Sequence, residues 1–93
     1  MYSLKLTAHT TNPTILSSLA WNAVRDAITK LGRTELIDYI ESVKVTEKRI
    51  VIKTGKPLVN SELSYHREPI QTRIEEAFQT FGVPKVERKI VFL

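Results

Sequence analysis

Apolar residues recur every three to four positions along the first third of the chain, a spacing that predicts an amphipathic helix. The helix starts at Asn12-Pro13, because asparagine is a favoured N-cap and proline at the first helical position loses no hydrogen bond. It ends before Gly32, which can adopt the left-handed backbone found at helix C-termini. Its expected buried stripe comprises Leu16, Leu19, Ala20, Val24, Ala27, Ile28 and Leu31.

Two later segments also show helical spacing. The first is short and has Thr34 as its expected N-cap. Its buried side comprises Leu36, Ile37 and Ile40. The second follows Gly55-Lys56-Pro57, with helical spacing from Val59 through to Gly82, and Pro69 interrupts it. Because a proline inside a helix removes one hydrogen bond and clashes with the preceding turn, we expect a kink or two abutting helices near Arg67-Glu68.

Between and after these helices the period of the pattern is two, which predicts strands. Residues 43–46 and 49–54 are rich in β-branched side chains and predict a hairpin. Glu47-Lys48 joins them and is not a favoured two-residue turn, so a longer loop is also compatible with the sequence. Residues 86–93 predict a third strand, and residues 2–8 alternate in the same way.

The element order predicts an α+β fold in which a three-stranded sheet carries its helices on one face. We expect residues 1–12 to form an N-terminal arm or a short extra strand, and residues 13–93 to form a single domain. This order is similar to that of type II KH-like domains. KH domains hold nucleic acid with a Gly-x-x-Gly loop between two helices. Residues 65–69 occupy the matching position and contain no glycine, so standard KH recognition is not expected.

Composition narrows the classes of protein that the chain can belong to. It contains no cysteine, which excludes disulfides, cysteine-bound zinc and thiol nucleophiles and fits a reducing compartment. No apolar run approaches the roughly 20 residues of a membrane span, and the start of the chain lacks the apolar core of a signal peptide. We therefore expect a cytoplasmic protein without membrane contact.

The balance of charge favours a polyanionic partner. The chain has 14 Lys and Arg against 10 Asp and Glu, a net charge of +4. The candidate nucleic-acid-binding residues lie on the hairpin and the last strand: Lys44, Lys48, Arg49, Lys53, Lys56, Lys85, Arg88 and Lys89. Such a surface can follow a phosphate backbone by releasing counterions. Lysines on strand edges also prevent sheets from pairing, and Glu47 and Glu87 interrupt both clusters, so a merely solvated surface is the alternative.

Other chemistry finds little support in the sequence. Glu62 and His66 lie one helical turn apart near Ser61 and Ser64, but no glycine-rich elbow accompanies them, and a half-buried histidine is the simpler interpretation. A His9–His66 pair without cysteine rarely makes a metal site. We expect no catalytic residues, no metal and no cofactor.

Trp21 is an alternative stacking platform for a base. It lies at the edge of the apolar stripe of the first helix, which favours packing against the core.

Three stretches resemble the DciA-like family of bacterial domains of unknown function, which includes a loader or operator of the replicative helicase. They are Trp21-Asn22-Ala23-Val24, then Lys48–Ile52 followed by Pro57–Leu63 with its Glu-Leu pair, and finally Ile70 and Ile74 followed by Val86–Leu93. The sequence departs from the family at Arg25-Asp26, where many members carry glycine, and its lack of cysteine excludes the zinc ribbon once described for the family.

The resemblance implies a non-enzymatic bacterial module that assists the replicative helicase in DNA replication and contacts single- or double-stranded DNA. One alternative is a protein-interaction domain or homodimer that uses the apolar final strand for sheet extension. Another alternative, an RNA-binding or ribosome-associated protein, follows from the KH-like topology by analogy.

Overall fold

The computed structural model describes residues 12–93, which form an α+β fold, as the sequence predicts. The expected strand within residues 2–8 lies outside the described residues. The elements are α2 (Pro13–Lys30), the 3-10 helix η1 (Thr34–Tyr39), β1 (Ser42–Val45), β2 (Arg49–Lys53), α3 (Pro57–Tyr65), α4 (Arg67–Phe81) and β3 (Lys89–Phe92).

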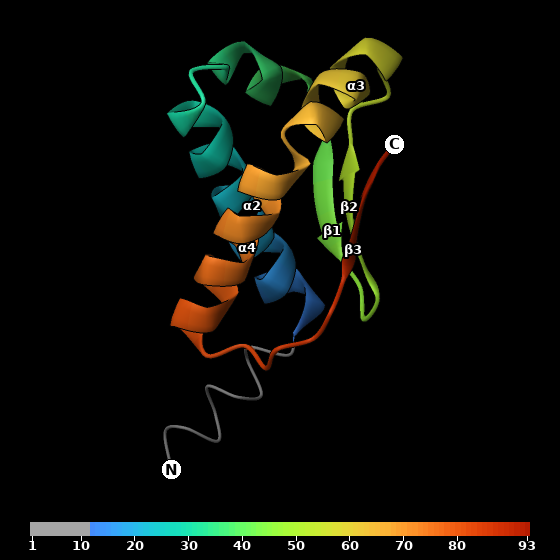
Figure 1. The fold of residues 1–93 in the computed structure, drawn as a ribbon. Helices are drawn as coiled ribbons and strands as arrows, with labels where there is room; N and C mark the ends of the chain where they lie inside the picture. The colour runs from blue at the N-terminus through green and yellow to red at the C-terminus, as the bar shows by residue number, and fades with distance from the viewer. Residues whose placement is uncertain (1–11) are drawn as a thin grey trace.

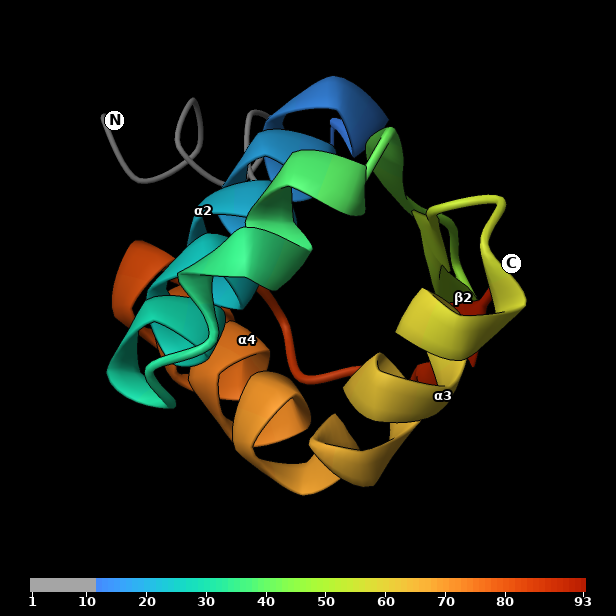
Figure 2. The same cartoon turned by 90° about the horizontal axis from the view of Figure 1, so that it is seen from above.

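The three strands form a mixed sheet in the order β1-β2-β3. β1 pairs with β2 antiparallel, with Val45 opposite Ile50, and β2 pairs with β3 parallel, with Ile50 opposite Ile90. Helices α2 and α4 lie together on one side of this sheet, and α3 sits at one end of it (Figure 1). Seen from above, α2 and α4 lie on one side of the view, and α3 lies with β2 on the other (Figure 2). This arrangement confirms the α+β prediction and is compatible with a KH-like fold.

Helix α2 begins and ends where the sequence predicts. The Asn12 side chain accepts a hydrogen bond from the Thr14 N–H at 2.8 Å, and Pro13 is the first helical residue. Gly32 follows the C-cap with φ of +74°, a conformation that a side chain would strain. The helix buries one face against α4 and β1.

The helix at 34–39 differs in detail from its prediction. It is a single 3-10 segment, and Thr34 is its first residue rather than its cap. Arg33 holds the N-cap position without a side-chain hydrogen bond to the helix. Leu36 and Ile40 are buried as expected, and Ile37 packs at the edge of the core.

A two-residue loop closes the hairpin, and Thr46 replaces the missing Asn-Gly signal. The Thr46 N–H donates to the Arg49 carbonyl at 2.8 Å, while the Arg49 N–H donates to the Thr46 hydroxyl at 3.0 Å. Because a side chain takes over one backbone bond of the turn, Glu47-Lys48 can join the strands without a longer loop.

The long helical segment is two abutting helices, as Pro69 predicts. The break falls at His66, whose φ of −104° and ψ of 24° leave the helical region. Pro69 then lies in the first turn of α4, where its missing N–H costs little. Arg67 opens α4, and its guanidinium lies 5.5 Å from the centre of the Phe92 ring, on the helical side of β3.

The final strand is shorter than predicted. It starts at Lys89 rather than at residue 86, and Val86 is 49% exposed in the connecting segment. The reason is the parallel ladder, in which Lys89 lies opposite Arg49. Arg49 is the first residue of β2, so earlier residues have no strand to pair with.

We expect a large loss of stability when a buried side chain at the centre of the sheet is truncated. Ile52 is fully buried, opposite Val43 on one side and Phe92 on the other. We expect Ile52→Ala to lower the free energy of unfolding by about 2–5 kcal/mol, because it removes buried methyl groups and leaves a cavity.

Urea denaturation followed by circular dichroism measures this change. Leu58→Ala is the matched control, because Leu58 is 84% exposed and its truncation should shift stability by less than about 0.5 kcal/mol. Equal losses in the two variants would show that Ile52 is not in the core.

Candidate nucleic-acid interface

The sheet has a second face that none of the described helices covers. Along β2, Ile50 and Ile52 are buried while Arg49 and Lys53 are exposed, and Val51 between them is half-buried. Because successive side chains of a strand point to opposite faces, Arg49, Val51 and Lys53 share the face away from the helices. Figure 1 shows that side of the sheet without a helix.

The neighbouring strands extend this face through their register. Lys89 lies opposite Arg49, Val91 and Lys44 lie opposite Val51, and Ser42 lies opposite Lys53. We call this surface the basic face, and its members are Ser42, Lys44, Arg49, Val51, Lys53, Lys89 and Val91. It carries four cations around two valines, and the strands place no acidic side chain on it.

The other predicted residues lie at the margins. Lys48 is exposed in the hairpin turn, Lys56 precedes α3, and Lys85 is exposed in the segment before β3. Arg88 is already engaged, because its Nε donates to the Thr46 carbonyl at 2.8 Å and its guanidinium lies 5.6 Å from the Phe78 ring. Arg88 therefore braces the hairpin turn from the segment that leads into β3.

Ion pairs within residues 12–93 lie on the helical side of the molecule. Arg73 bonds Asp26 at 2.6 Å, and Lys30 lies 3.7 Å from the same carboxylate. Arg33 bonds both Glu35, at 2.6 Å, and Glu62, at 3.0 Å. The cations of the basic face have no carboxylate partner among the described residues, so their charge is available to a ligand.

The helical pairs hold their carboxylates ionised. The hydrogen bond from Arg73, aided by the charges of Lys30 and Arg73, lowers the pKa of Asp26 below its ordinary 3.8, against a smaller desolvation cost. The hydrogen bond from Arg33 likewise lowers the pKa of Glu35 below 4.5. Both carboxylates are partly exposed, so each pair adds modestly to stability.

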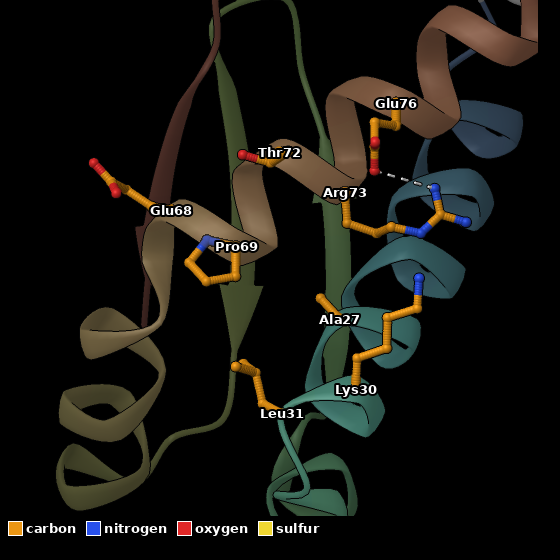
Figure 3. A pocket seen from close by; sticks show the side chains of 8 residues that line it. All are labelled: Ala27, Lys30, Leu31, Glu68, Pro69, Thr72, Arg73 and Glu76. Atoms are coloured by element: carbon orange, nitrogen blue, oxygen red, sulfur yellow. Dashed lines mark ion pairs between the residues drawn. The ribbon is translucent and has the colours of Figure 1, made fainter.

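A groove of about 430 Å³ lies between α2 and α4 (Figure 3). Its walls carry Lys30 and Arg73 but also Glu68 and Glu76, with Leu31 among its apolar residues. Figure 3 shows Arg73 directed toward Glu76, 3.9 Å away, and its Nε is taken by Asp26. The cations of this groove are thus already neutralised, which makes it a poor site for an anion.

The residues considered for catalysis have other partners. Glu62 accepts a hydrogen bond from Arg33, and His66 lies half-buried at the junction of α3 and α4. Among residues 12–93 there is no cluster of three or more metal-ligating side chains, and His9 lies outside them.

Trp21 packs at the edge of the core beneath the Arg25 guanidinium, 5.2 Å from its ring centre. This contact confirms the expected packing of Trp21 against the core.

Two polar residues that sequence patterns do not single out organise the sheet. Thr54 is buried, and its hydroxyl donates to the Asn60 side chain at 2.6 Å and accepts from the Lys56 N–H at 3.1 Å, which ties the end of β2 to the start of α3. The hydroxyl of Ser17 on α2 accepts the Val45 N–H at 3.0 Å. The only local sequence signal for the role of Thr54 is its place directly after a β-branched strand and before Gly-Lys-Pro. The bond between Ser17 and Val45 joins residues far apart in the chain, so no local pattern predicts it.

Comparison of the chain with profiles of protein families, with curated proteins and with solved structures finds no match. In the part of the chain that the structure describes, the helices are too short or too polar to cross a membrane.

Because of the ion pairs that Asp26 makes on α2, we expect the stability of the fold to decrease as the pH is lowered. A lowered pKa in the folded state means that Asp26 stabilises the fold above about pH 4 and loses this contribution as the pH drops through its folded-state pKa. We expect Asp26→Asn to lower the melting temperature at pH 7 and to flatten its decline between pH 5 and pH 2. Melting curves across this range measure the effect.

Glu75→Gln serves as the control, because Glu75 is exposed on α4 and forms no ion pair among the described residues. If both variants follow the pH profile of the unaltered protein, the Asp26–Arg73 pair does not contribute to stability.

Proposed function

We propose that the protein is a non-enzymatic nucleic-acid-binding module that contacts the phosphate backbone through the basic face. The observation that carries this proposal is the placement of Lys44, Arg49, Lys53 and Lys89 on one open sheet face without carboxylate partners among residues 12–93. Cations left free of ion pairs can release counterions from a polyanion, which drives such binding.

The chemistry of the face argues for binding without sequence preference. Lysine and arginine contacts to phosphates position a protein on nucleic acid but do not discriminate bases. The centre of the face carries Val51 and Val91, which offer apolar contact and no hydrogen bonds to base edges. A strand of DNA or RNA would therefore lie across the sheet with its phosphates toward the cations that surround the valines.

The resemblance to DciA-like domains supports a narrower proposal, that this binding assists the replicative helicase during DNA replication. Gel filtration of the protein with a bacterial replicative helicase tests it, and we expect the two to co-elute. Separate elution at micromolar concentrations would remove the helicase role and leave the nucleic-acid proposal in place.

The basic face predicts a specific salt dependence. Contact with four phosphates gives a slope of log K against log salt of about −3 for single strands and about −4 for duplex DNA. In Arg49→Ala/Lys89→Ala, which removes two of the four cations, we expect the slope to fall by about half and the affinity to fall equally for all sequences. Fluorescence anisotropy with labelled single-stranded DNA, duplex DNA and RNA at several salt concentrations measures both.

Arg25→Ala/Lys30→Ala is the matched control, since it removes the same charge from helix α2 on the other side of the sheet. Its slope should stay that of the unaltered protein. Equal weakening in both double variants would mean that net charge alone, and not the basic face, holds the nucleic acid.

A further inference from the structure

Strand β3 presents an unpaired backbone edge. Its ladder to β2 uses alternate residues: the Lys89 N–H donates to Lys48 at 3.0 Å, and the Leu93 N–H donates to Ile52 at 2.9 Å. In a parallel ladder the N–H and C=O of the intervening residues point the other way. The backbone groups of Ile90 and Phe92 therefore face outward, and nothing in residues 12–93 is hydrogen-bonded to them.

The two edge strands of the sheet, β1 and β3, differ in whether their outward backbone groups have partners. The outward N–H of Val45 on β1 is taken by the Ser17 hydroxyl, and α2 lies along that strand. Exposed edges are usually blunted by charges, proline or a bulge. In β3, after Lys89, the sequence Ile90-Val91-Phe92-Leu93 carries none of these, so only the short length of the strand protects this edge.

We propose that this edge binds the same edge of a second copy of the chain, antiparallel, to make a continuous six-stranded sheet. A second copy suits this edge because the edge is self-complementary. Ile90 and Phe92 lie two residues apart, so two antiparallel copies can exchange hydrogen bonds between all of these outward backbone groups.

The outward groups fix the register of this pairing. In an antiparallel ladder, residues that exchange hydrogen bonds lie opposite each other. The register that pairs Ile90 with Phe92 of the second copy uses the outward groups of both residues in each copy. It puts the two Val91 residues opposite each other on the two-fold axis and Lys89 opposite Leu93. No like charges face each other directly, so the arrangement avoids the repulsion that disfavours such pairs.

A two-fold axis perpendicular to the sheet keeps both basic faces on the same side. The paired sheet would bring two sets of Lys44, Arg49, Lys53 and Lys89 onto one surface, with Val51 and Val91 of both copies in a central apolar strip. This consequence rests on the proposed function, whereas the pairing itself does not.

Single cysteines test the register without nucleic acid, because the chain has no cysteine of its own. A non-hydrogen-bonded antiparallel pair places its Cα atoms about 4.5 Å apart, within the roughly 4.4–6.8 Å that disulfides require. We expect Val91→Cys to form disulfide-linked dimers under mild oxidation. A mixture of Lys89→Cys and Leu93→Cys should crosslink, while either alone should not. Lys44→Cys, exposed on the other edge strand, is the control for random collision.

A charged side chain placed at the two-fold axis of the proposed dimer tests whether the two copies associate. Val91→Lys puts two ammonium groups opposite each other, and we expect it to abolish the concentration-dependent doubling of the 10.6 kDa mass in analytical ultracentrifugation. Val91→Thr keeps the β-branched shape and should still dimerise. Mass and crosslinking are measured without nucleic acid, and the nucleic-acid proposal is tested separately by the salt dependence of the unaltered protein, so failure of the dimer and failure of the nucleic-acid proposal are separable.

The opposite results would overturn the pairing. A mass of one chain at every concentration, together with crosslinking of Val91→Cys no faster than that of Lys44→Cys, would show that a second copy does not bind this edge.

Discussion

The structure depends on the two ladders that β2 makes at the same time. On one side it pairs antiparallel with β1, its neighbour across a two-residue loop, and on the other it pairs parallel with β3, forty positions further along (89 − 49 = 40). These two registers decide which face every strand residue occupies. A shift of one residue in either ladder would turn cations into the core and isoleucines into water.

The same two registers separate the apolar core of the domain from its basic face. Ile50, Ile52 and Ile90 close the core beneath α2 and α4, while their immediate neighbours form the basic face. On the helices, by contrast, arginine and aspartate or glutamate meet in pairs and largely cancel. Four cations without carboxylate partners among residues 12–93 are thereby gathered on one surface of a chain whose net charge is +4.

Local signals explain what the sequence predicts correctly, and long-range contacts explain the rest. The Asn12 cap, the Pro69 break and the hairpin follow from neighbouring residues. The start of β3 depends on where β2 begins, which is why the alternation at Val86 is misleading. The strand register is needed to decide which of the eight candidate cations share one face of the sheet. Arg88, for example, is adjacent to Lys89 in the sequence, yet its side chain bonds the Thr46 carbonyl. Thr34 fails as a cap because the chain adopts a tight 3-10 turn there.

The parallel pairing of β3 also has a consequence for the order of events during synthesis. Loop closure over forty residues is slower than hairpin formation, and β3 emerges from the ribosome after both helices that precede it. Until then the nascent chain has the hairpin but lacks Lys89 and Val91 beside it. The basic face is thus completed only when β3 docks, so a partly synthesised chain lacks two of the seven residues of this face.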